Sequence, residues 1–380
     1  MKRSSLLLLL IVAATLLFRH ISTTGPTVVQ MEDRDTTLNR CFDLAHKEAV
    51  AKEYKHGYWI GYSIRRLMEE NSFVGSFYSE KKRNHPTLAE IIAGIRLNNT
   101  DEPDYDIEGC QTLGGVVCAE NGSKPGKTIL KELGILFHFD GPLNKEPGDI
   151  KISNLSLHVN LDNDPLIWLS GFNTGQSVTF LREQFKNISS AVIQEDIIRA
   201  IGLHEASDQS FSFLKEILMS NLKNSLREES AFWMGQQNTD DALTTLMGTA
   251  QKDKSEDVRE KAIFAISEME NEKATGSLIE LASRADEGNV RSKAMFWLSQ
   301  RASEKVATII SDIAQTDDDT EVQKQAVFAL TQLSDDESIH ALIKIARTHR
   351  NPELRKSAIF WLGQSQDSRA LDAIVEIIKN

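Results

Sequence analysis

Five segments in the second half of the chain repeat one pattern at equal steps of 32 residues. Each segment opens with Leu or Val, usually continues with Arg, and carries a small residue at offset 4 and Phe at offset 6. The opening residues are Leu226, Val258, Val290, Val322 and Leu354. A unit this short can bury its apolar side chains only against its neighbours, so the repeat predicts a stacked array of similar units.

Each unit is predicted to be a pair of helices. The first helix is predicted from apolar residues at offsets 4, 6 and 8, interpreted as one buried face. Its aromatic column is Phe232, Phe264, Phe296, Phe328 and Phe360. A polar turn such as 364–368 follows, and then a second helix with its own column of Leu246, Leu278, Ile310, Leu342 and Ile374. The predicted fold class is therefore mainly α, an αα-superhelix or solenoid, with a small β or α+β domain before it.

A second rhythm of 64 residues overlies the first. The residue after each Phe alternates between large and small, in the order Trp233, Ala265, Trp297, Ala329 and Trp361. Trp168 continues this alternation backward, which predicts a solenoid from 165 to 380 with about six to seven units. Large against small in successive layers is typical of an interdigitated core. A row of Trp could instead form a ligand platform, and core packing is favoured.

Two polar rows accompany the repeat. Arg227, Arg259, Arg291 and Arg355 stand at offset 1, where Gln323 interrupts the row. Gln236, Glu268, Gln300, Gln332 and Gln364 stand at offset 10. Such rows could form a binding stripe, but we favour a structural role in satisfying helix ends and joining neighbouring units.

The first 24 residues are predicted to be a targeting segment. Lys2 and Arg3 precede a 13-residue apolar run, Leu6 to Phe18. Thirteen helical residues span roughly 20 Å, short of the ~30 Å of a bilayer core, which favours a signal peptide over an uncleaved inner-membrane anchor. Either alternative places the protein in the periplasm or cell envelope of a bacterium.

In that compartment Cys110 and Cys118 could form a disulfide, while Cys41 is predicted to be a buried small residue.

The region between this segment and the solenoid changes character along its length. Residues 28–55 are predicted to be helical, and 56–163 a small β-rich domain that caps the solenoid. A β-hairpin is predicted from His56–Ile64 and Phe73–Tyr78. Two further strands are expected at Ile135–Phe139 and Ile150–Leu161.

The repeats resemble HEAT-like repeats of the phycobilisome-lyase type. The resemblance rests on the apolar-Arg opening and on helix ends such as Trp361-Leu362-Gly363-Gln364, and it covers about 165 to 380. It implies a right-handed superhelix whose second helices line a concave surface that holds protein partners. The candidate contacts on that surface are Asp240, Asp241, Lys273, Glu280, Lys305, Asp312, Lys344 and Asp372.

These observations predict a non-enzymatic exported scaffold that binds a protein partner and carries no cofactor or metal. The formal net charge is −12, which argues against a nucleic-acid partner.

Two alternatives stay open. One is an enzyme, either a lyase or metal-dependent oxidoreductase by analogy with HEAT-like enzymes, or one with chemistry around His56, Tyr58, Trp59 and His138. A di-iron site of the HEAT-like kind needs several His-Glu pairs, and the chain offers His204-Glu205, interpreted as a solvated helix end. The other is a cell-wall or carbohydrate-binding protein using Tyr58, Trp59 and Tyr62.

Overall fold

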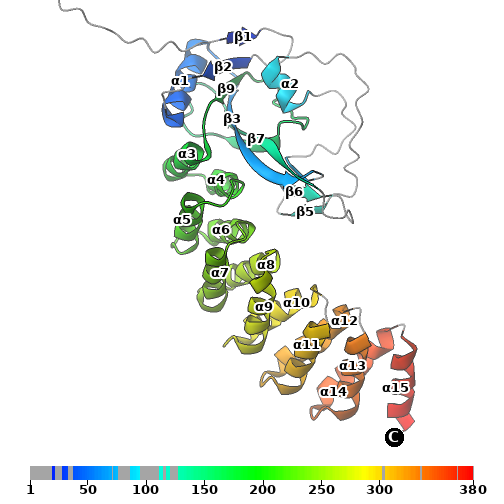
Figure 1. Cartoon of the computed structure of the whole chain (residues 1–380). Coiled ribbons are helices and arrows are strands. Elements are labelled where there is room, and N and C mark those ends of the chain that lie inside the picture. The colour runs from blue at the N-terminus through cyan, green and yellow to red at the C-terminus, as the bar shows by residue number, and fades with distance from the viewer. Residues whose placement is uncertain are drawn as a thin grey trace, which may run out of the picture. The chain divides into compact units, whose positions relative to one another are not determined.

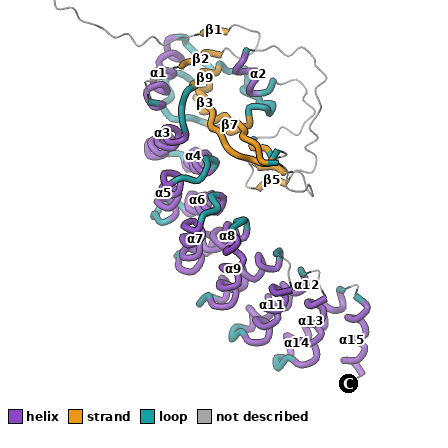
Figure 2. The backbone as a smooth tube through the Cα atoms, viewed as in Figure 1, coloured by secondary structure: helices purple, strands orange, loops and turns teal. Residues whose placement is uncertain are grey.

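The computed structural model describes residues 19–21, 28–32, 37–70, 72–75, 86–94, 111–113, 117–119, 127–301, 304–333, 336–365 and 367–379. Its contacts divide the chain into two compact units, Met1–Ala200 and Ile201–Asn380. Figures 1 and 2 show that strands are confined to the first unit and that the second is built of helices. Among the helices within the described ranges, none combines the length and apolar character that a membrane crossing needs.

The first unit is organised around a mixed six-stranded sheet. Its strands are β1 (Arg19–Ile21), β2 (Val28–Glu32), β3 (Tyr58–Glu69), β7 (Thr128–Phe139), β8 (Asp149–Asn154) and β9 (Leu166–Ser170), in the spatial order β1-β2-β9-β3-β7-β8. β9 lies parallel to both of its neighbours, whereas β3, β7 and β8 are antiparallel. The pairing of β3 with β7 runs from Tyr58 opposite Phe139 to Glu69 opposite Thr128, so it spans the whole of both strands.

The predicted β-hairpin is wrong. β4 (Phe73–Val74) does not return along β3 but joins a separate three-stranded sheet of order β4-β6-β5, with β5 at Gln111–Leu113 and β6 at Val117–Ala119. The place beside β3 is taken by β7, whose twelve residues pair with all twelve residues of β3. Cys110 lies outside the described residues, as does the side chain of Cys118, so the predicted disulfide stays a prediction.

Helices cover both faces of the large sheet. α1 (Leu38–Ala51) and α3 (Thr174–Asn187) begin at Thr37 and Asn173, whose side chains accept hydrogen bonds from the backbone three residues on. Their apolar faces meet β3 and β7, and Phe42 lies 5.2 Å from Phe137 and 4.7 Å from Phe180 between ring centroids. The short α2 (Leu88–Ala93) packs on the opposite face, beside Trp59 and Trp168. α4 (Ala191–Gly202) follows α3.

Three sequence-based boundaries in this unit need correction. Residues 28–55 are not one helix, because Val28–Glu32 pairs with β9 as a strand and helix begins only at Leu38. The strand predicted over Ile150–Leu161 ends at Asn154. Trp168 is on β9, in the sheet core, so it does not belong to the helical repeat and the 64-residue alternation does not reach it. Of the predicted segment 1–24, only Arg19–Ile21 lies within the described residues, where it forms β1.

The second unit is a tandem array of helical hairpins, as predicted. The first helices are α6 (Asn224–Gln236), α8 (Glu256–Ser267), α10 (Gly288–Ser299), α12 (Thr320–Gln332) and α14 (Pro352–Gln364). The second helices are α7 (Asp240–Lys252), α9 (Glu272–Arg284), α11 (Glu304–Thr316), α13 (Asp336–Thr348) and α15 (Ser368–Lys379). α5 (Asp208–Leu218) precedes them. The contacts that form a helix lie within a few residues along the chain, so the same repeated pattern specifies the two helices of every unit.

One consequence of the first unit's packing is a dependence of stability on pH. Burial lowers the pKa of His46 and raises the pKa of Tyr58 to about 12, so a neutral imidazole and a protonated hydroxyl share the hydrogen bond of 2.6 Å between His46 Nδ1 and the Tyr58 oxygen. A depressed pKa means that the unfolded chain binds the proton first as pH falls through 6.5, so stability is lost in that direction. We expect the protection factors of amides in α1 and β3, which are corrected for the pH dependence of intrinsic exchange, to fall from pH 7.5 to pH 5.5 in the wild type. The fall should be smaller in His46→Gln, and an equal fall in both would contradict this assignment.

Candidate partner-binding surface

The row of arginines at offset 1 is structural, as predicted. Arg259, Arg291 and Arg355 each donate from Nη1 to the carbonyl oxygen six residues earlier, at 2.7, 2.8 and 2.7 Å. Those carbonyls lie at the C-terminal ends of the second helices, where backbone acceptors lack partners within the helix. Each arginine therefore ties a first helix to the turn that precedes it.

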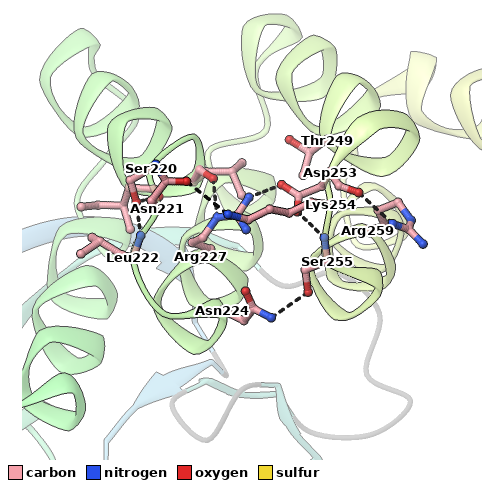
Figure 3. A network of polar contacts seen from close by, with 12 residues as sticks. Ser220, Asn221, Leu222, Asn224, Arg227, Thr249, Asp253, Lys254, Ser255 and Arg259 are labelled. Carbon is pink, nitrogen blue, oxygen red and sulfur yellow. Dashed lines mark hydrogen bonds and ion pairs between the residues drawn. The ribbon is translucent and has the colours of Figure 1, made fainter.

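Three arginines of the row also pair with an acidic residue in the turn that follows the second helix of their own repeat. Arg227 pairs with Asp253, and Arg259 pairs with Glu287 at 2.9 Å. Arg291 binds both carboxylate oxygens of Asp317, at 2.8 and 2.9 Å, which raises the pKa of Arg291. Figure 3 shows Arg227 and Arg259 meeting at Asp253, with Ser255 bound to the same residue. These side chains are committed to joining neighbouring units.

The surface of the first helices carries a row of aromatic side chains that the sequence interpretation placed in the core. Phe232 is buried as predicted, with 6% exposed, whereas the exposed fraction is 40% for Phe296 and 58% for Phe360. Helical geometry explains the error: at about 100° per residue, offset 6 lies about 200° around the helix from offset 4. The buried column is offset 5 instead, with Ala231, Ile263, Met295 and Val327 each fully buried.

The aromatic row forms two equivalent clusters on the array. In the first, Trp297 lies 4.8 Å from Phe264 and 5.1 Å from Phe296 between ring centroids. In the second, Trp361 lies 5.3 Å from Phe328 and 5.0 Å from Phe360. Each Trp is half-buried and spans two neighbouring first helices, so each cluster is a Phe-Trp-Phe triad with an open face. We call these six residues the aromatic row.

Trp233 occupies the same column but is only 1% exposed. Its indole lies against Gly202, where a Cβ atom would approach the tryptophan ring to 2.5 Å. Its Nε1 donates to Glu229 at 2.8 Å. The prediction that the tryptophans are core residues is therefore confirmed for Trp233, whereas Trp297 and Trp361 help to form the surface. The small residues of the alternation, Ala265 and Ala329, are buried as predicted.

Polar side chains border the aromatic row. Gln300, Gln332 and Gln364 are exposed, four residues after a Phe on the same helix. On the other border the Lys293 ammonium pairs with Glu260 at 2.9 Å, and Lys261 lies 5.4 Å above the Phe264 ring. The amides are uncharged and these lysines have partners or a ring beneath them. The row therefore presents aromatic faces and amide groups, with the Lys261 ammonium at its border.

Glu268 is the exception in the glutamine row, and it supports a stability prediction. Burial raises the pKa of Glu268, against an opposing effect of Arg301. A raised pKa means that the folded state holds the proton more tightly, so stability falls as pH rises above 4.5. We expect Glu268→Gln, which installs the residue of the other four units, to stabilise the array by about 0.5 kcal/mol at pH 7. Urea unfolding followed by circular dichroism at pH 7 and pH 4 measures it; a gain of the same size at pH 4 would exclude this cause.

The eight residues predicted to contact a partner from the second helices are all exposed. Part of their charge is already matched within the array. Lys273 binds Asp240, which lowers the pKa of Asp240. Asp312 lines a cavity of about 440 Å³ together with the paired Arg291 and Asp317. Their role in partner binding stays a prediction.

The residues considered for chemistry in the first unit are mostly buried. Tyr58, Trp59 and Tyr62 are each at most 1% exposed, so they cannot present a stacking surface to a sugar. Trp59 and His138 lie on one face of the sheet, 4.6 Å apart, whereas Tyr58 faces His46 on the other. His56 is exposed. In the second unit, His204 is 2% exposed, so it is not the solvated helix end that was expected.

His138 is held between two carboxylates. Its Nε2 lies 2.8 Å from Asp164 Oδ2, and its Nδ1 lies 3.3 Å from Asp140 Oδ1. Gly57, just before β3, packs directly against His138 and Asp164. A Cβ atom at this position would come within 2.8 Å of the His138 ring. This arrangement ties β7 to the turn before β9. Within the described residues, no group of three or more His, Cys, Asp or Glu side chains is arranged to hold a metal ion.

Three solved structures are similar to parts of the chain. The chain is similar to human deoxyhypusine hydroxylase in complex with glycerol, at 16% identity over 53% of this chain and 77% of that one, with a TM-score of 0.29. It is similar to the complex of CpcE and CpcF of phycocyanin lyase from Nostoc sp. PCC7120, at 15% identity over 40% of this chain and 97% of that one, with a TM-score of 0.30. It is also similar to the Pds5-Scc1 complex, at 11% identity over 54% of this chain and 42% of that one, with a TM-score of 0.30.

No curated protein matches the chain. The family that matches is that of the HEAT repeats, over residues 211–299 and 307–380. The first of these segments contains α6 to α10, and the second contains α12 to α15 and most of α11. The phycobilisome-lyase subtype stays a prediction. The second unit of this protein is thus a solenoid of helical repeats that match the family model of the HEAT repeats.

Proposed function

We propose that this protein is a non-enzymatic exported scaffold that holds a protein partner on its HEAT repeats. The observation that carries the proposal is the aromatic row, with Phe296 and Phe360 exposed at 40% and 58%. Exposed aromatic clusters are a feature of partner-binding surfaces, because such rings contribute large contact area at low entropic cost. Export is supported by the apolar run Leu6–Phe18 after Lys2 and Arg3.

The geometry of the row favours an extended segment of the partner. The two triads stand two repeats apart, and packed helices are separated by about 10 Å, so the triads are about 20 Å apart. An extended chain advances about 3.3 Å per residue, which places two anchoring side chains about six residues apart. Apolar or aromatic side chains would contact the triads, while Gln300, Gln332 and Gln364 can donate to and accept from the backbone between them.

Site-specific crosslinking in the full chain tests this proposal. A photoreactive phenylalanine analogue placed at Phe296 or at Phe360 should capture the same envelope protein, in one extended segment. The double variant Phe296→Ser/Phe360→Ser should reduce recovery of that protein at least tenfold in a pull-down with a tagged chain. Leu143→Ser is the matched control, since Leu143 is 89% exposed in the first unit and should leave recovery unchanged.

Two outcomes contradict the proposal. The first is capture of different proteins from the two positions, which indicates nonspecific apolar contact. The second is recovery that survives the double variant. Recovery lost instead on charge reversal at Glu280 and Lys344 would return the binding surface to the second helices, as the sequence alone predicted.

A further inference from the structure

The outer face of α15 exposes a stripe of apolar side chains. The exposed fraction is 64% for Leu371, 41% for Val375 and 78% for Ile378. Their spacing of four and three residues places them in one line along the helix. The stripe belongs to a second helix, whereas the aromatic row lies on first helices.

Ile378 departs from the repeat at a position that is otherwise constant. The same column holds Ala250, Ala282, Ala314 and Ala346, each at most 2% exposed. An Ala at this position allows the helices of the following unit to pack closely, and the additional volume of Ile prevents the same approach. The outer face of α15 therefore does not suit a further unit stacked in the same manner.

The charges that border the stripe complement one another when two such helices pair. Asp372 and Lys379 are exposed on the same side of the stripe, seven residues apart, and the exposed Glu376 between them pairs with Arg347 of α13. In an antiparallel pair with its two-fold axis at Val375, Asp372 of one helix lies beside Lys379 of the other, and the reverse contact repeats across the axis. Leu371 then packs beside Ile378 of the second copy. The stripe and its charges are thus self-complementary.

We propose that this face binds a second copy of the same chain, through an antiparallel α15–α15 contact. Both triplets of apolar side chains become buried, and two Asp–Lys pairs fix the antiparallel direction. The interface is small, so the dimer is weak and forms in the micromolar range. Two copies joined in this way would present two aromatic rows from one assembly, which increases avidity for a repeated or dimeric partner.

Sedimentation equilibrium of the full chain in mild detergent, from about 1 to about 100 µM, tests the proposal. We expect a monomer–dimer equilibrium in the wild type and monomer throughout for Ile378→Asp. Asp372→Lys and Lys379→Asp should each weaken association about tenfold, while the double swap restores it. Phe360→Ser is the control and should leave the dimer unchanged. All four positions are exposed, so circular dichroism should show an unchanged fold.

A cysteine at the axis tests the geometry directly. Val375→Cys should form a covalent dimer under mild oxidation, because its side chain meets its own copy, whereas Glu280→Cys on α9 should not. The proposal is overturned if the wild type stays monomeric at every concentration. It is equally overturned if a dimer persists in Ile378→Asp, if the double swap fails to restore association, or if Val375→Cys crosslinks no better than Glu280→Cys.

Discussion

Replacement of Arg227 by Ala is expected to lower the free energy of unfolding of the HEAT-repeat unit by about 3 kcal/mol. The side chains of Arg227 and Asp253 are 4% and 8% exposed, so removing the guanidinium leaves a buried carboxylate without its cation. The substitution also removes the hydrogen bond from Arg227 Nε to the Leu218 carbonyl oxygen, at 2.9 Å. Urea unfolding followed by far-ultraviolet circular dichroism measures the loss.

Arg355→Ala is the matched control for this prediction. Arg355 stands at the same place in its repeat and donates to the carbonyl oxygens of His349 and Arg350, at 2.7 and 3.2 Å. The described residues give it no acidic partner, so its loss should cost only about 1 kcal/mol. Equal losses for the two variants would show that the carbonyl bonds, and not the buried pair with Asp253, carry the effect.

The second large effect is expected where the arginine row is interrupted. Gln323 and His349 stand 26 residues apart, the same separation as Arg227–Asp253 and Arg291–Asp317. Both are buried, and Gln323 Nε2 and His349 Nε2 have no hydrogen-bond partner within the described residues. His349 Nδ1 accepts from the Asn351 N–H at 3.0 Å, so its hydrogen is on Nε2. A rotated Gln323 amide would offer that hydrogen an oxygen acceptor.

The folded unit should therefore tolerate arginine at position 323 and aspartate at position 349 only when both are present. Gln323→Arg alone and His349→Asp alone each place an unpartnered charge in a buried site, and each should destabilise the unit by about 2 kcal/mol. The double variant recreates the Arg291–Asp317 arrangement and should recover most of the loss, giving a coupling energy of about 2 kcal/mol or more. The four proteins form a double-mutant cycle in urea unfolding. Additive losses would show that the two side chains do not meet.

The sequence predicted those parts of the fold that arise from local pattern. The helices of the repeat follow the 32-residue columns, because an apolar helix face is encoded within a few turns. The failures all involve strands. Val28–Glu32 and Leu166–Ser170 are short segments that pair with each other across more than a hundred residues, and β3 pairs with β7 rather than with the nearby Phe73. No local signal distinguishes such segments from helix or from a hairpin arm.

The sequence predicted which aromatic residues form the repeated columns, but not that part of them face the surface rather than the core. The Phe and Trp columns were visible in the sequence, and their regular spacing suggested a core. A helical projection would have separated offset 5 from offset 6 and placed Phe296 and Phe360 with the glutamines on the outer face. Their degree of exposure depends on the approach of neighbouring helices, which the pattern of one chain does not contain.

The position of β9 between β2 and β3 has a consequence for the order in which the protein folds. Val28 pairs with Leu166, so the large sheet must close a connection of well over a hundred residues before β2 finds its place. Each hairpin of the solenoid closes within a single repeat. Contacts between distant residues form slowly because of the entropy of loop closure, and local helical contacts form rapidly. We therefore expect the part of the chain that is synthesised later to reach its native structure first.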